Sequence, residues 1–181
     1  MLDNDNVFRV LSEFGQQVVN RSRANFRGKN ATRKGIDSVK YDLDVFKNSF
    51  GLSFEMEDYM NFQDKGVKGV ESGSSTAGYH YKHHPTPYKK GAGVVPPSSA
   101  FDKWTIMKGL AGRDANGRFL TRKGLNRAIA INIYKHGIKP SLFFTKAFER
   151  EFKDLPDDLV EAYGLDVEKL MKSTLKSNDI K

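Results

Sequence analysis

The chain has no cysteine among its 181 residues, so it can form neither a disulfide bond nor a thiolate metal site. It also lacks a run of about 20 apolar residues, the length that a helix needs to cross a bilayer. The first ten residues, MLDNDNVFRV, are acidic and do not resemble a signal peptide. These absences predict a protein made and used in the cytoplasm, or packed into a particle that is assembled there, with no membrane partner.

Sequence motifs of common enzymes are also missing. The patterns GxxxxGK[ST], GxGxxG, GxSxG and HExxH do not occur. Asp42 and Asp44 alternate with apolar residues, which places both carboxylates on the wet face of a strand and argues against paired-carboxylate catalysis. The sequence therefore predicts no enzyme and no cofactor.

The composition is sufficient for a packed core. Hydrophobic residues make up 38% of the chain and aromatic residues 12%, with 13 phenylalanines as the main core filler. The length predicts a single domain over residues 1–181. The net charge of +8 is compatible with acidic partners or nucleic acid, or with solubility alone.

The first third of the chain predicts a helix, a hairpin and a short helix. Residues 3–6, DNDN, supply caps for a helix that continues to about Asn25 with apolar residues at helical spacing. Residues 36–56 alternate apolar and polar residues on both sides of Lys47-Asn48-Ser49, as a half-buried hairpin does. A short helical segment then starts at residues 57–58 and ends at Gly66.

The stretch 121–152 predicts two helices joined by a turn. Leu125, Ile129 and Ile133 share one face of the first helix, which the other apolar residues widen until most sides are apolar. Gly137 should end this helix, and Ser141 can cap the second one. The predicted fold is α+β: a short antiparallel sheet packed on the first helix and on the helix at 123–136, with a long loop insertion at 70–120 and a helical C-terminus at 154–181.

The chain reverses charge after Phe152. Acidic residues dominate the C-terminal extension, where Pro156 should break the helix. A short helix should follow from Leu159, and Gly164 should separate it from the last apolar residues. Basic residues dominate earlier in the chain. Opposite patches of this kind can meet head to tail between subunits of a ring, or can be ordinary surface charge.

The basic stretch from Arg21 to Lys34 admits two interpretations. It can be a phosphate-binding strip, because lysine and arginine displace counterions from nucleic acid. It can also be a solvated helix end and loop, since cations are favoured near a helix C-terminus. The second interpretation is preferred because no aromatic residues interleave for base stacking.

Residues 67–97 are rich in Gly, Ser, Pro, Tyr and His, and a loop of this length is usually functional or disordered. His80, His83 and His84 can be a zinc or nickel site of a metal-dependent enzyme, although no cysteine or nearby acid completes the ligand set. The preferred interpretation is a contact arm that a partner orders, because it combines aromatic and cationic side chains. Its candidate interface residues are Tyr79, Tyr81, Tyr88, Lys89 and Lys90.

The remainder of the insertion predicts a helix and a tight turn. Ser98 and Ser99 should cap a helix that contains Trp104, which anchors the insertion or serves as an exposed contact. Asn116-Gly117 is a strong turn signal for a small hairpin. A basic cluster surrounds this turn, and three of its members, Arg113, Arg118 and Arg122, are further candidate interface residues; Lys123 and Arg127 complete the cluster.

Two segments resemble the tail-completion, or head–tail joining, proteins of tailed bacteriophages. RAIAINIYKHGIKPSLFFTKAFE is similar to that family's closing motif, in which an Ala-rich helix ends at a Gly and an apolar Pro-Phe segment leads into a helix ending in Ala-Phe-Glu. DYMNFQDKGVKG is similar to an upstream segment in which two aromatic residues precede a Gly. With the first helix and the hairpin, the resemblance covers about residues 5–69 and 121–153, and residues 70–120 depart from it.

The resemblance implies a structural protein of the virion neck, assembled in the host cytoplasm. It would form a closed ring of identical copies that joins the portal or connector to the tail, with other neck, portal or tail proteins as partners. The alternatives from the residues themselves are a basic nucleic-acid-binding protein, which is not favoured, and a metal-dependent enzyme at His80, His83 and His84.

Overall fold

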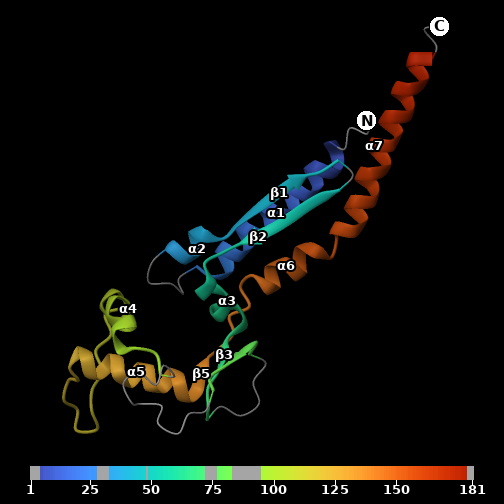
Figure 1. Cartoon of the computed structure of the whole chain (residues 1–181). Helices are drawn as coiled ribbons and strands as arrows, with labels where there is room; N and C mark the ends of the chain where they lie inside the picture. The colour runs from blue at the N-terminus through green and yellow to red at the C-terminus, as the bar shows by residue number, and fades with distance from the viewer. Residues whose placement is uncertain (1–4, 28–32, 48, 72–76, 83–94, 179–181) are drawn as a thin grey trace. The chain divides into compact units, whose positions relative to one another are not determined.

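The computed structural model describes residues 5–27, 33–47, 49–71, 77–82 and 95–178. The chain divides into two compact units. Unit 1 comprises residues 1–27, 34–57 and 143–181, and unit 2 comprises residues 28–33 and 58–142. Helices and two small sheets in the described residues confirm the predicted α+β class (Figure 1). That the chain forms one domain stays a prediction.

Unit 1 begins with the long helix α1 (Asp5–Asn25) and the hairpin of β1 (Lys40–Val45) and β2 (Phe50–Glu55). The strands pair antiparallel, with Tyr41 opposite Phe54 and Leu43 opposite Leu52. Alternation along each strand puts these side chains on one face, as the sequence predicts. The hairpin approaches α1 closely, because a Cβ atom at Gly15 would lie 2.6 Å from the Tyr41 ring.

Aromatic rings fill the core of unit 1. The Phe14 ring meets Phe54 and Phe148 edge to face, at centroid distances of 6.2 and 5.7 Å. Such pairs contribute about 0.5–1.5 kcal/mol each beyond their burial. Phe148 belongs to α6 (Thr145–Phe152), so the second helix over the hairpin is α6. The sequence interpretation had placed the helix at 123–136 there, but that helix belongs to unit 2.

The C-terminal helix α7 (Leu155–Asn178) is continuous, and both breaks expected in it are absent. Pro156 lies in its first turn, where the missing N–H group would have no helical partner in any case. Gly164 lies inside the helix with open space around it, so it weakens the helix without ending it. No described helix is both long and apolar enough to span a bilayer.

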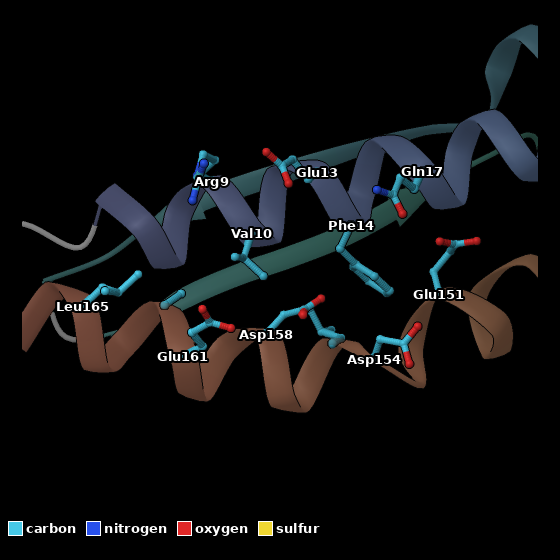
Figure 2. A pocket seen from close by; sticks show the side chains of 12 residues that line it. Arg9, Val10, Glu13, Phe14, Gln17, Glu151, Asp154, Asp158, Glu161 and Leu165 are labelled. Carbon is cyan, nitrogen blue, oxygen red and sulfur yellow. The ribbon is translucent and has the colours of Figure 1, made fainter.

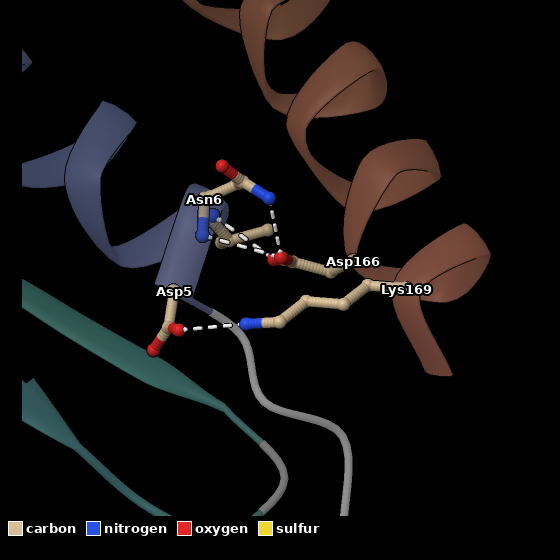
Figure 3. Close-up of polar contacts among 5 residues, drawn as sticks. Asp5, Asn6, Asp166 and Lys169 are labelled. Atoms are coloured by element: carbon tan, nitrogen blue, oxygen red, sulfur yellow. Dashed lines mark hydrogen bonds and ion pairs between the residues drawn. The ribbon is translucent and has the colours of Figure 1, made fainter. Parts of the chain in front are cut away.

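A carboxylate of α7 caps the start of α1 (Figure 3). Asp166 accepts hydrogen bonds from the backbone N–H groups of Asn6 and Val7, each at 3.2 Å, and from the Asn6 amide at 2.7 Å. Lys169 adds an ion pair with Asp5 at 3.0 Å. The sequence predicted a local cap in DNDN, of which residues 3 and 4 lie outside the described residues. The cap that the structure shows comes instead from the far end of the chain.

Unit 2 contains a second small sheet, in which β3 (Val67–Lys68) is central. It pairs in parallel with β4 (Tyr79–His80) and antiparallel with β5 (Gly137–Ile138). The short helix α3 (Asp58–Lys65) precedes it and ends before Gly66, as predicted. Gly137 has φ +80°, and a Cβ atom there would lie 1.9 Å from the Val67 carbonyl oxygen. Only glycine fits this position.

The helix α5 (Arg122–His136) has the predicted extent but a different buried stripe. Asn126, Ala130 and Tyr134 are buried, whereas the expected core residues Leu125, Ile129 and Ile133 are half-buried. The stripe includes a polar residue because the Thr105 hydroxyl hydrogen-bonds Asn126 at 3.1 Å. Thr105 belongs to α4 (Asp102–Met107), which follows the short 3-10 helix η1 (Ser98–Phe101).

Two predicted helix caps are wrong. Pro97 precedes η1, and no side chain caps it, so Ser98 and Ser99 do not serve as caps there. Phe144 precedes α6, again without a side-chain cap. The Ser141 hydroxyl instead donates a hydrogen bond to the Gln63 carbonyl at 2.7 Å, which ties the segment before α6 to the end of α3 within unit 2.

Candidate functional site

The predicted turn at Asn116-Gly117 closes a small hairpin, which we call the basic hairpin (residues 113–119). Arg113 and Phe119 form its β-bridge. The Asp114 carboxylate accepts hydrogen bonds from the backbone N–H groups of Asn116 and Arg118, at 2.9 and 2.8 Å. Gly117 has φ +78°, which a turn of this kind requires. The hairpin is therefore held by its own backbone, and its side chains are left on the surface.

One arginine of the hairpin lies over an exposed phenyl ring. The Arg113 guanidinium lies 3.8 Å from the centroid of Phe119 and donates a hydrogen bond to the Gly117 carbonyl at 2.7 Å. Phe119 is 66% exposed. Arg118 is exposed, and so is Arg122 in the first turn of α5. The three predicted arginines thus lie within ten residues of one another in the chain, and one of them, Arg113, packs on the Phe119 ring.

Further apolar side chains are exposed next to the basic hairpin. The Leu120 N–H group donates to the Gly112 carbonyl at 2.8 Å, which keeps the hairpin ends together. Aromatic residues, Met and Arg are the side chains that interfaces favour. The sequence interpretation named Trp104 and Met107 in a helix and Phe119 and Leu120 in a hairpin, and it considered an exposed contact only for Trp104. We use the name aromatic–basic patch for the arginines Arg113, Arg118 and Arg122 together with the exposed apolar residues that precede or belong to this part of the chain: Trp104, Ile106, Met107, Leu110, Phe119 and Leu120.

Tyr79 and Tyr81 pack within unit 2, which differs from the free arm that the sequence predicted. Tyr79 lies in β4 with its ring against Phe62, at a centroid distance of 4.7 Å. The Tyr81 ring meets Tyr134 at 5.8 Å, and burial raises the pKa of the Tyr81 phenol. Their role in an interface stays a prediction. Tyr88, Lys89 and Lys90 lie outside the described residues.

The structure describes one member of the histidine cluster, His80, which is exposed on β4. His83 and His84 lie outside the described residues. Among the residues that the structure describes, no group of three His, Asp or Glu side chains is placed to hold a metal ion. The metal-dependent enzyme stays a prediction without structural support.

Three of the six basic residues at 21–34 form contacts inside unit 1, and Lys29 lies outside the described residues. Arg21 forms an ion pair with Glu151 of α6. The Arg23 guanidinium donates to the Val39 carbonyl at 2.8 Å. Lys34 starts the short helix α2 (Lys34–Ser38), which was not predicted, and pairs with Glu57 at 3.3 Å. These contacts favour the structural interpretation over a phosphate-binding strip.

An acidic groove lies between α1 and the segment formed by α6 and α7 (Figure 2). Its volume is about 310 Å³. Buried Phe14, Leu155 and Ala162 form its apolar lining. Arg9 is the one basic residue of the lining. The carboxylates of the groove are Glu13, Glu151, Asp154, Asp158 and Glu161.

Most of these carboxylates are available to a partner. Glu13, Asp154, Asp158 and Glu161 are exposed, while Glu151 is half-buried against Arg21. Like charges held this close repel one another, so a cationic ligand would be favoured here. The sequence showed the acidic C-terminal region but missed the groove, because α1 supplies one wall from 140 residues upstream.

Comparison with known proteins identified no relative. No family model, curated protein or solved structure matches the chain. A functional conclusion therefore depends on the resemblance at residues 58–69 and 121–152 and on the two charged surfaces.

Proposed function

We propose that this protein is a structural component of a tailed-phage virion, which acts at the neck as one copy of a closed ring that joins the portal or connector to the tail. The resemblance of residues 58–69 and 121–152 to tail-completion proteins supports this function. The observation that supports the assembly mechanism is that each unit exposes a surface of opposite charge to the other's: the acidic groove in unit 1 and the aromatic–basic patch in unit 2.

The two surfaces complement each other in chemistry. The groove has an apolar lining and a carboxylate rim, while the basic hairpin presents the Phe119 ring against Arg113, with Arg118 exposed next to it in the chain. Burial of the ring would supply affinity, and the rim charges would steer and orient the approach. Two different surfaces that bind each other form a head-to-tail contact, which generates a ring when the rotation closes.

A charge exchange tests this contact. Arg118→Glu with Arg122→Glu should abolish binding of a tagged chain to wild-type grooves, because carboxylates would then face carboxylates. A chain with Asp158→Lys and Glu161→Lys should bind the charge-reversed hairpin of the first chain and so restore capture. Arg27→Glu, an exposed cation of unit 1, is the matched control and should leave capture unchanged. Failure of the exchanged pair to bind would refute the contact.

Nucleic-acid binding is the second candidate, because exposed aromatic rings beside arginines also suit stacked bases. The affinity would then fall steeply with salt, with a log–log slope of about −0.7 to −0.9 per phosphate contacted. We expect no tight binding near physiological salt. Tight binding that is lost in Arg118→Ala and Arg122→Ala, but retained when the groove carboxylates are changed, would favour this candidate over the ring.

A further inference from the structure

The helix α7 carries an exposed apolar stripe that neither unit 1 nor the acidic groove uses. We call it the α7 stripe: Val160, Tyr163, Val167, Met171 and Leu175. Val160 is 74% exposed, Tyr163 55%, Met171 60% and Leu175 63%, while Val167 in the middle of the stripe is half-buried. Steps of three and four residues keep these side chains on one side of the helix. An apolar stripe of this length on a surface helix indicates a covering partner.

The stripe lies apart from the side of α7 that packs within unit 1. Leu155, Leu159 and Ala162 repeat on the core-facing side, and Asp166 continues that side to the α1 N-terminus. At about 100° per residue, the stripe lies roughly 130° around the helix from this side. Lys169 already pairs with Asp5, the first residue of α1, so the last two turns of α7 extend beyond α1 (Figure 1).

The charges of α7 determine how a second copy would lie on the stripe. Acidic residues are confined to the part before Lys169, and Lys169 and Lys172 follow. Two such helices side by side in the same direction would place acid beside acid. Two antiparallel helices place the acidic half of each beside the basic half of the other, and their dipoles oppose as well.

We propose that the α7 stripe is the docking surface for the α7 stripe of a second copy of this chain, packed antiparallel with Val167 at the crossing point. The stripe is self-complementary about this residue: Tyr163 of one copy meets Met171 of the other, and Val160 meets the segment around Leu175. A thioether against an aromatic ring is a favourable contact. The contact is two-fold and isologous, so it differs from the head-to-tail contact of the ring and does not depend on it.

The natural chain has no cysteine, so engineered cysteines report this contact without background. In helices packed about 8–10 Å apart, facing Cα atoms come within the range that a disulfide spans. Under mild oxidation of the full chain, Val167→Cys should form a covalent dimer, because the residue faces its own copy. Mixed Tyr163→Cys and Met171→Cys chains should form a disulfide-linked heterodimer, whereas neither variant alone should form a covalent dimer. Lys172→Cys, exposed on another side of α7 and outside the acidic groove, is the control and should not cross-link.

A disulfide-linked dimer of Tyr163→Cys alone would indicate a parallel contact and overturn the proposal. Absence of both the Val167→Cys dimer and the mixed heterodimer would also overturn it. The two readouts use different positions, so a folding defect of one variant does not decide the result. Sedimentation gives a second measurement: Met171→Glu should shift the natural chain from dimer to monomer, and an unchanged dimer would contradict the proposal. Neither test alters Arg118 or the groove, so failure here is distinguishable from failure of the ring contact.

Discussion

The interiors of unit 1 and unit 2 are stabilised by different kinds of contact. The core of unit 1 is apolar and aromatic, with Phe14 and Val18 buried among the rings of the hairpin and α6. Unit 2 has two-residue strands, buried Asp64, Thr105 and Asn126, and glycines at its closest backbone approaches. The comparison teaches that aromatic packing dominates the interior of the first unit, whereas the second combines buried Met60 and Tyr134 with buried polar groups and close backbone approaches. Single substitutions in each unit can test this difference.

The largest effect is expected at the centre of the unit 1 core. Phe14→Ala removes a ring in contact with Phe54, Phe148 and Phe152, and should lower the free energy of unfolding by about 3–5 kcal/mol. Denaturant unfolding followed by circular dichroism measures this loss. Phe8→Ala on the same helix is the matched control, and its cost should be small because Phe8 is 43% exposed. Equal losses in the two variants would contradict the aromatic core.

The same variant tests whether the chain forms one domain. Trp104 is the sole tryptophan and lies in unit 2, so its fluorescence reports that unit. If the two units unfold as a single cooperative domain, Phe14→Ala should shift the tryptophan transition as far as the circular dichroism transition. A tryptophan transition that stays at its wild-type midpoint would show that the units unfold separately.

In unit 2 the largest effect is expected from one added methyl group. Gly137→Ala combines positive φ with a clash against the Val67 carbonyl, and should cost about 3 kcal/mol or more by separating β5 from β3. Loss of amide-exchange protection around residues 67–70 would localise the damage. Gly109→Ala is the control, since it has φ +61° but open space around it. If both substitutions cost the same, the close approach is unimportant.

A polar contact of unit 1 should have an intermediate effect. Asp166→Ala removes the acceptor of the first N–H groups of α1 and should cost about 2 kcal/mol. Thermal unfolding measures the change. Glu168→Ala, two residues away and exposed, should be nearly neutral. No difference between the two variants would show that the long-range cap contributes little.

The smallest changes in stability are expected at two helical glycines, where the same substitution should act in opposite directions. Gly164→Ala should stabilise the protein by about 1 kcal/mol, because alanine favours a helix and nothing lies within 4 Å. Gly15→Ala should destabilise it despite the same propensity, because its Cβ would overlap the Tyr41 ring. Stabilisation by both substitutions would refute the close packing of β1 on α1.

The sequence predicted those features that depend on neighbours in the chain. The period of α1, the alternation of the β1–β2 hairpin and the Asn116-Gly117 turn are local signals, and the structure confirms each. Of the two predicted partners of the hairpin, the first helix is confirmed and the helix at 123–136 is wrong. The second error arose because the helices at 123–136 and 145–152 are both apolar. Only tertiary packing decides between them.

The candidate surfaces were likewise predicted only where their residues are neighbours in the chain. The sequence predicted the arginines of the basic hairpin because they cluster along the chain. It predicted the acidic C-terminal region for the same reason. The groove was missed because Glu13 and Phe14 of α1 line it together with residues 151–165. Pro156 misled the interpretation for a related reason: a proline ends a helix or starts one, and the sequence alone did not show which side of it was helical.

The most direct test of the proposed function is the location of the protein in mature particles. Virions should be purified to homogeneity, and the protein quantified against the portal protein and located with a labelled antibody. The account predicts a fixed number of copies per virion at the junction of head and tail, and loss of these copies when Arg118→Glu and Arg122→Glu are combined. Protein found only in the infected-cell lysate, and absent from purified virions, would contradict it.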